Sequence, residues 1–68
     1  MIKLYSKIRI ITDKYSTDGV PLGTVGTVLD VYDSGDIEVQ FEDAEGNSTD
    51  IFFAVCIEDV EPQCSEEL

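Results

Sequence analysis

The sequence predicts a single, small, all-β domain, and three observations lead to this fold class. A chain of 68 residues has room for one hydrophobic core. Its hydrophobic residues, 43% of the chain, occur in short runs rich in valine and isoleucine, without the period or length of a helix. Turn-forming residues separate these runs at intervals of about 8–12 residues. Four or five short strands with this spacing are typical of a small barrel or sandwich.

The first half of the chain predicts a strand, a long loop and a second strand. Residues 7–11 alternate polar and apolar side chains, which places Ile8 and Ile10 on one face of a strand. Residues 13–23 have the Asp, Ser, Thr, Gly and Pro composition of a loop. Residues 24–32 are rich in β-branched side chains and lack a helical period, so we expect the second strand there.

A turn at residues 33–36 leads into the clearest predicted strand, residues 37–42. Gly35 supplies the residue that adopts positive φ in the turn. Along the strand, apolar and polar residues alternate strictly, so successive side chains point to opposite faces. We expect the core face to carry Ile37, Val39 and Phe41, and the solvent face Glu38, Gln40 and Glu42.

The C-terminal part predicts one more hairpin and a short final strand. The expected elements are a turn, a fourth strand, a single helical turn and a very short last strand, at residues 43–47, 48–55, 56–60 and 61–62. We expect the folded domain to span residues 1–62 and residues 63–68 to form a flexible acidic tail.

The net charge of −11 is the strongest signal about partners, with 15 acidic residues against four basic ones. All four cations lie within the first fourteen residues, at Lys3, Lys7, Arg9 and Lys14. Such a field repels nucleic acid and anionic membranes, because binding to either requires cations. It attracts basic proteins and accelerates their encounter. We therefore expect a basic protein partner, no nucleic acid and no membrane.

The composition also argues against an enzyme. The chain has no histidine, so Ser-His and Cys-His pairs cannot be built, and two cysteines supply too few zinc ligands. Carboxylates without a pocket to raise their pKa do not act as general acids. Residues 43–50 resemble a calcium loop only superficially, because Gly46 stands fourth where an EF-hand needs glycine sixth. We expect no catalysis, no cofactor and no specific metal.

Two further expectations concern the cellular location of the protein and the state of its cysteine thiols. The chain has no apolar run near the ~20 residues of a membrane span, and its first residues lack the pattern of a signal peptide. We therefore expect a cytoplasmic protein. In a reducing compartment Cys56 and Cys64 are expected to remain thiols, with a disulfide between them as the alternative.

Residues 23–41, GTVGTVLDVYDSGDIEVQF, carry a glycine-bounded strand that leads through a turn into a second strand. This pattern resembles the SH3-like and KOW-like small barrels. With a D-x-x-G turn at residues 43–46 and a D-V-x-P segment at residues 59–62, it is similar to an uncharacterised family of stand-alone bacterial SH3-like domains. The resemblance implies a five-stranded SH3-like barrel with a short 3-10 turn before the last strand. In such a barrel Gly23 and Gly26 would permit a bulge or a close approach.

The resemblance, joined to the charge, implies an immunity or antitoxin protein that occludes a basic toxin, expected to be a nuclease. Two alternatives remain open. The first is a nucleic-acid mimic that inhibits a host or phage DNA-handling enzyme. The second is an accessory domain of a larger enzyme, which predicts an apolar patch around Phe52 and Val55. Peptide binding of the SH3 type is disfavoured because the chain has no tryptophan, and KOW-type RNA binding because the field is negative.

The candidate partner-binding residues are acidic positions in predicted turns and on outward strand faces, together with one tyrosine. Carboxylates in these places accept bidentate hydrogen bonds from arginine, and aromatic side chains serve as anchors. The predicted surface comprises Tyr32, Asp33, Asp36, Glu38, Glu42, Asp43, Glu45, Asp50, Glu58 and Asp59. Tyr15 and Phe52 are further candidates for the anchor, with burial of Phe52 under a loop as the alternative.

Overall fold

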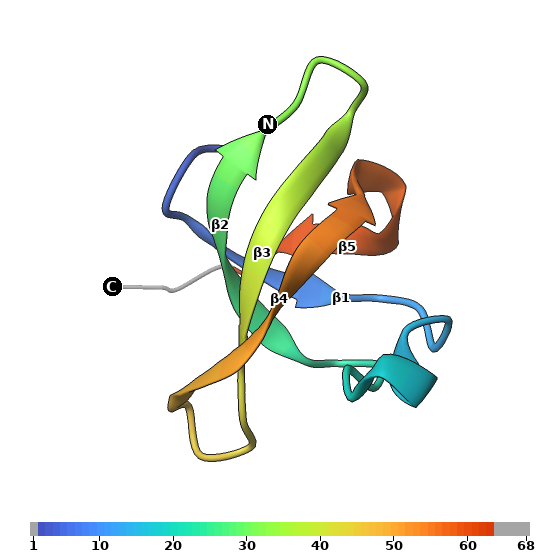
Figure 1. Cartoon of the computed structure of the whole chain (residues 1–68), viewed down its shortest axis with the longest axis vertical. Helices are drawn as coiled ribbons and strands as arrows, with labels where there is room; N and C mark the ends of the chain where they lie inside the picture. The colour runs from blue at the N-terminus through green and yellow to red at the C-terminus, as the bar shows by residue number, and fades with distance from the viewer. Residues whose placement is uncertain (1, 64–68) are drawn as a thin grey trace.

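The computed structural model of the chain describes residues 2–63 and has five antiparallel strands in one sheet (Figure 1). The elements in chain order are β1 (Lys7–Ile10), η1 (Ser16–Asp18), β2 (Val25–Val31), β3 (Asp36–Glu42), β4 (Ser48–Cys56), η2 (Ile57–Asp59) and β5 (Val60–Pro62). Both η segments are single 3-10 turns. The described residues include no helix long and apolar enough to span a membrane.

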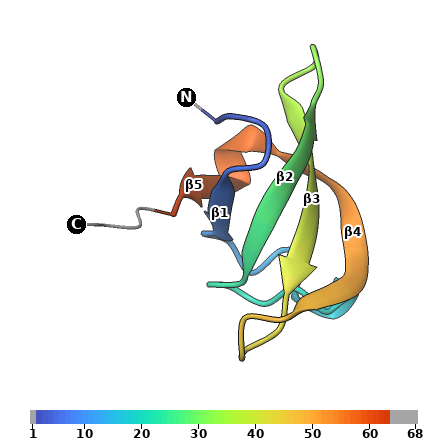
Figure 2. The same ribbon diagram turned by 90° about the vertical axis from the view of Figure 1, so that its left-hand side faces the viewer.

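The strand order across the sheet is β4-β3-β2-β1-β5. Strands β1 to β4 pair with their neighbours in sequence, and β5 returns to pair with β1, with Arg9 opposite Glu61. The strands curve around a single core (Figure 2). Within residues 2–63 no ladder joins β4 to β5, so the sheet is open along its hydrogen bonds.

Nine hydrophobic side chains are buried in this core. They are Ile8, Ile10, Val20, Val28, Ile37, Val39, Phe41, Val55 and Val60. The inward positions predicted on β1 and β3 are therefore confirmed. The ring of Phe53 extends the core, with its centroid 5.1 Å from the ring of Phe41 and 5.7 Å from that of Tyr15. Val20 comes from the loop before β2, where the polar composition gave no sign of a core residue.

The C-terminal prediction is confirmed up to Pro62, with the 3-10 turn directly before the last strand. The backbone N–H of Gln63 donates to the carbonyl of Lys7 at 3.0 Å, so the first residue of the predicted tail is still bonded to β1. The rest of the predicted tail, residues 64–68, lies outside the described residues, and so does Cys64 with its alternative disulfide.

The two glycines of the G-x-x-G pattern have different roles. Gly26 is buried in β2, where a Cβ atom would collide with the Val39 side chain and lie 2.9 Å from the carbonyl oxygen of Gln40. Gly23 has φ +94° and open space around it, so it is a turn glycine. The bulge of β2 lies elsewhere, at the register shift between Val28 and Asp30. Gly26 thus provides the predicted close approach, whereas neither glycine provides the bulge.

Strand β4 is an edge strand with an irregular pairing to β3. Gln40 lies opposite Phe52 and Glu42 opposite Ser48, so two steps along β3 match four steps along β4. The Thr49 hydroxyl donates to the carbonyl of Phe41 at 2.9 Å, and the Gln40 side-chain amide donates to the carbonyl of Thr49 at 3.1 Å. These bonds hold a bulge of two extra residues in β4.

We predict that Gly26→Ala destabilises the fold by about 2–3 kcal/mol, because the new methyl group meets both a buried side chain and the backbone of β3. Gly23→Ala is the matched control: it adds the same methyl group in open space and costs only the strain of positive φ, about 1 kcal/mol. Urea unfolding of both variants checks the order. Equal losses would contradict the close approach.

Candidate functional site

Three carboxylates come together on the outward face of the sheet near the turn between β2 and β3. Asp30 and Glu38 are direct cross-strand partners, and Asp36, two residues before Glu38, lies on the same face of β3. Like charges at opposed positions destabilise a sheet, since their Cβ atoms are only about 5 Å apart. A fold that carries this repulsion concentrates negative charge at one place on its surface.

Tyr32 lies beside this group and bonds to it. Its hydroxyl donates to Oε1 of Glu38 at 2.9 Å. This hydrogen bond is the main reason that the pKa of Tyr32 is raised above its usual value of 10.0. The hydroxyl of Tyr32 is thus held as a donor to Glu38, while the residue remains 40% exposed.

An exposed aromatic residue and a small residue complete the face on β4. Phe52 lies opposite Gln40 and Ala54 opposite Glu38, so both point outward with the carboxylates. Phe52 is 58% exposed, so of the three consecutive apolar residues 51–53 it is the one that faces solvent. Ile51 and Phe53 are half-buried on the other face. We call Asp30, Tyr32, Asp36, Glu38, Phe52 and Ala54 together the outer-face patch.

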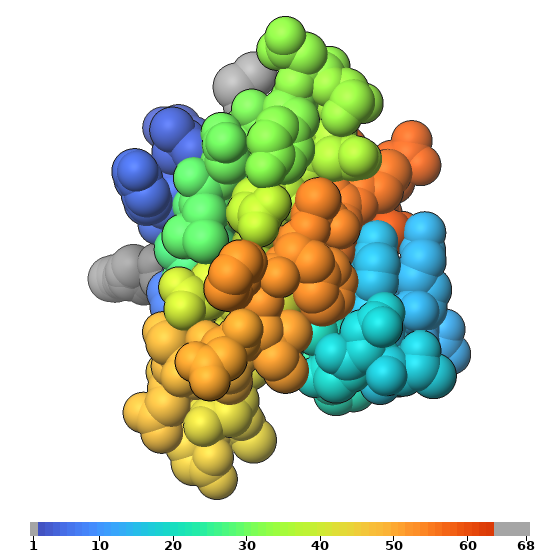
Figure 3. Space-filling model, viewed as in Figure 1, coloured from blue at the N-terminus to red at the C-terminus, as the bar shows by residue number. Residues whose placement is uncertain are grey.

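Figure 3 shows this face of the molecule, with β4 across the centre and the β2–β3 hairpin at the top. The apolar patch predicted around Phe52 and Val55 does not form, because the alternation of β4 turns Val55 into the core, where it is only 2% exposed. Phe52 therefore stands with polar neighbours rather than within a broad apolar surface.

Three of the four cations of the N-terminal segment form ion pairs elsewhere. Lys7 forms an ion pair with Glu42, and Arg9 with Glu61 directly opposite on β5. Lys14 pairs with Asp59, its Nζ atom 2.9 Å from Oδ2. Within residues 2–63, no ion pair reaches a carboxylate of the outer-face patch. The negative charge of this patch is therefore not neutralised by the described chain.

The single acidic surface predicted from the sequence is divided in the structure. Asp43 and Glu45 lie in the β3–β4 turn, at the opposite end of β3 from Asp36 (Figure 1). Seven strand residues at ~3.3 Å each separate the two ends by about 20 Å. Asp50 lies in the bulged part of β4, also away from the β2–β3 turn. These acidic positions do not share one face.

The remaining predicted residues fall into two groups. Asp33 and Glu58 lie close to the outer-face patch, because Asp33 is in the β2–β3 turn and the backbone N–H of Ile57 donates to Gly35 of that turn at 3.2 Å. Glu42 and Asp59 are occupied by ion pairs. Asp30 was missed by the sequence reasoning. Strict alternation from buried Val28 points it inward, and only the bulge in β2 turns it outward.

Asp59 ties the long loop to η2. The Tyr15 hydroxyl donates to its Oδ2 atom at 2.7 Å, and Lys14 binds the same oxygen. The tyrosine hydrogen bond, followed by that of the lysine, lowers the pKa of Asp59 below its ordinary value of 3.8. Burial, followed by the bond to Asp59, raises the pKa of Tyr15. Tyr15 is therefore a structural residue whose ring packs on Phe53, not an exposed anchor.

The carboxylate of Asp43 forms hydrogen bonds within the turn at residues 43–47. Oδ1 of Asp43 accepts the backbone N–H groups of Glu45 and Asn47 at 3.0 and 2.9 Å. In the described part of the chain, no three His, Cys, Asp or Glu side chains converge in a way that could hold a metal ion. Asp43 thus stabilises a hairpin.

No family model, curated protein or solved structure matched the chain.

We predict that Asp59→Asn lowers the free energy of unfolding by about 1 kcal/mol at pH 7. Because folding lowers the pKa of this carboxyl, its contribution is fully present above the unfolded pKa near 3.8 and disappears as pH falls through the lower folded value. Urea unfolding at pH 7 and at pH 2.5 checks this. Glu58→Gln, in the same turn, controls for the removal of one charge. If the difference in the free energy of unfolding between wild type and Asp59→Asn were undiminished at pH 2.5, the ionised Asp59 carboxylate would not be what stabilises this part of the fold.

We predict that Glu38→Gln lowers the pKa of Tyr32, because the neutral amide no longer penalises the phenolate. NMR titration of the tyrosine ring carbons measures this directly. Glu42→Gln makes the same change at the other end of β3 and should leave Tyr32 unmoved. If both variants shift Tyr32 equally, the general field and not the hydrogen bond sets its pKa.

Proposed function

We propose that this chain is an acidic protein-binding module, an immunity or antitoxin protein of the bacterial cytoplasm that neutralises a basic nuclease toxin. It would do so by occluding the active or nucleic-acid-binding surface of the toxin. The observation that carries the proposal is the outer-face patch, where within residues 2–63 the opposed carboxylates form no ion pair, while Lys7, Arg9 and Lys14 are paired elsewhere.

The repulsion between Asp30 and Glu38 supports a cationic partner on physical grounds. A guanidinium or ammonium group between the two carboxylates removes the repulsion and gains charge-assisted hydrogen bonds. The same partner groups would otherwise hold phosphates of a nucleic acid, so a nuclease surface offers the required cations. Binding energy then comes partly from strain that the free module already carries.

The two exposed aromatic residues supply the apolar part of such an interface. Tyr32 and Phe52 flank the carboxylates, and the small side chain of Ala54, on β4 opposite Glu38, leaves room for a partner side chain. Aromatic residues beside polar groups are the usual hot spots of protein interfaces. The combination fits an anchored interface better than steering by charge alone.

For the fold, the finer proposal is an SH3-like barrel. It is supported by five strands that curve around one core, a 3-10 turn directly before the last strand, and pairing of that strand with β1. An experimental structure in which β4 and β5 approach across the core would complete the barrel. A flat, two-layered arrangement would replace the barrel with a sandwich.

The proposal predicts a basic partner that co-purifies with the tagged chain from its native cells and is released by salt. Identification by mass spectrometry should yield a protein that is toxic when expressed alone and harmless when co-expressed with this chain. A non-toxic DNA-handling enzyme would instead establish a nucleic-acid mimic. A partner that resists salt would establish the accessory domain.

Once the partner protein is identified, Glu38→Lys should slow the association of this chain with it about tenfold or more at low salt, because the substitution reverses a charge inside the outer-face patch. Glu45→Lys changes the net charge equally in the β3–β4 turn, about 20 Å away, and should have a much smaller effect. Stopped-flow association rates decide between them, with circular dichroism as the folding check. Equal effects would mean that only total charge matters.

A further inference from the structure

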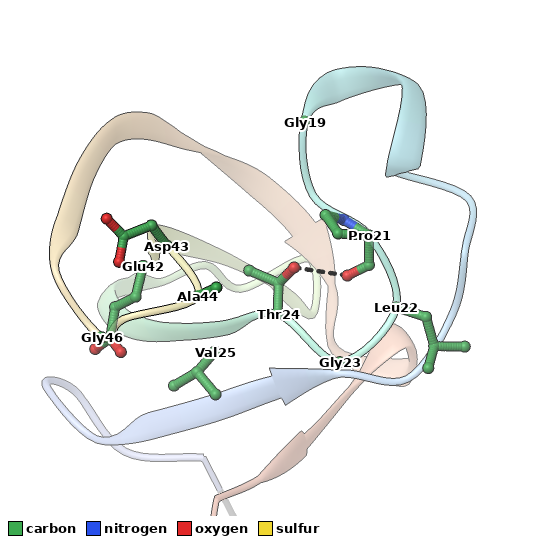
Figure 4. A pocket seen from close by; sticks show the side chains of 10 residues that line it. All are labelled: Gly19, Pro21, Leu22, Gly23, Thr24, Val25, Glu42, Asp43, Ala44 and Gly46. Atoms are coloured by element: carbon green, nitrogen blue, oxygen red, sulfur yellow. Dashed lines mark hydrogen bonds between the residues drawn. The ribbon is translucent and has the colours of Figure 1, made fainter.

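A concave surface lies at the other end of the molecule from the outer-face patch, between the loop before β2 and the β3–β4 turn (Figure 4). It is an open groove of about 470 Å³, within the usual range for binding sites. Its apolar and glycine residues are Gly19, Pro21, Leu22, Gly23, Val25, Ala44 and Gly46, and its polar ones Thr24, Glu42 and Asp43. The outer-face patch contributes none of them.

The groove offers apolar contacts that the chain itself does not use. Leu22 is 64% exposed at the rim of the groove, with its side chain turned away from Ala44, and Ala44 is itself exposed. The Thr24 hydroxyl donates to the carbonyl of Pro21 at 2.6 Å, so this residue turns its methyl group to the groove as a further apolar contact. Gly23 and Gly46 have no atom within 4 Å of where a Cβ would lie, so another chain can approach their backbone closely.

The charge of the groove favours a positively charged occupant. Two of its lining residues are acidic and none is basic. Glu42 is engaged by Lys7, whereas Asp43 uses Oδ1 for the turn and has no hydrogen bond at Oδ2 within residues 2–63. A cation beside this oxygen would be attracted both locally and by the net charge of −11.

The groove is poorly suited to a small polar ligand, because such sites need buried polar groups that fix orientation, and none of its lining side chains with polar atoms is buried. An extended peptide needs less enclosure. We infer that this groove docks a basic segment of a partner protein, with an apolar side chain beside Thr24 and Ala44, near Leu22 at the rim, and a flanking Lys or Arg side chain paired to Asp43.

The test uses the full chain labelled with ¹⁵N and capped five-residue peptides followed by amide NMR shifts. The probe is Gly-Lys-Leu-Arg-Gly, and the controls are Gly-Lys-Ser-Arg-Gly and Gly-Glu-Leu-Glu-Gly. We expect saturable shifts centred on Gly23, Ala44 and Gly46, with a dissociation constant on the order of 1 mM. Each control peptide should bind about fivefold more weakly or worse, since one lacks the apolar side chain and the other the cations.

Variants of the chain locate the site. Leu22→Ser removes an exposed apolar side chain and should weaken the probe about fivefold, whereas Val31→Ser, at a similarly exposed position (43%) near the β2–β3 turn, should not. Ala44→Trp fills the groove and should abolish the shifts. Glu38→Lys should leave peptide binding at the groove largely intact, so that loss of the proposed toxin interface and loss of this groove give different results.

Three outcomes would overturn the inference. Equal affinity for the leucine and serine peptides would show that charge alone attracts them. Shifts centred on the outer-face patch would place the peptide at the other end of β3. Concentration-dependent shifts of the groove amides without any peptide, which Ala44→Trp removes, would make a second copy of this chain the occupant.

Discussion

The alternation of side chains along β3 is the constraint on which the rest of the structure depends. Burying Ile37, Val39 and Phe41 fills the middle of a small core and, through the pleat, forces Asp36 and Glu38 outward. A slip of one residue would bury carboxylates and expose the core together. The candidate surface and the hydrophobic core therefore depend on the same register of β3, so a sequence change that shifts this register disrupts both.

Three of the four cations of this acidic chain link separate elements of the fold. Arg9 links β1 to β5, Lys7 reaches across β2 to Glu42, and Lys14 joins the long loop to η2. Individually, exposed ion pairs contribute little to stability. Their placement matters more for the electric field, because pairing neutralises the sheet near β1 and β5 and leaves the β2–β3 hairpin negative. The described part of the molecule therefore presents an asymmetric surface, which would orient a basic partner of the kind proposed above.

All five strands, their turns and the last 3-10 turn could be predicted from the sequence, because each depends on local alternation and turn chemistry. Val20 could not, since its burial depends on how a polar loop folds back over the sheet. The acidic candidates were identified by type but not by grouping. Whether Asp30 joins Glu38, or Lys7 neutralises Glu42, is decided by a bulge and by pairing between distant segments. An aspartate that strict alternation would bury was the one available sign of that bulge.

The irregular edge of β4 has a consequence for behaviour at high concentration. An exposed edge strand is a template on which other chains can add, and crowded small β proteins are prone to such growth. Here the two extra residues of the β4 bulge interrupt the row of backbone groups, and the Tyr15 hydroxyl accepts the N–H of Cys56 at 3.4 Å. Only a short stretch around Phe52 and Ala54 stays regular. This geometry disfavours edge-to-edge growth at β4 even though Phe52 is exposed.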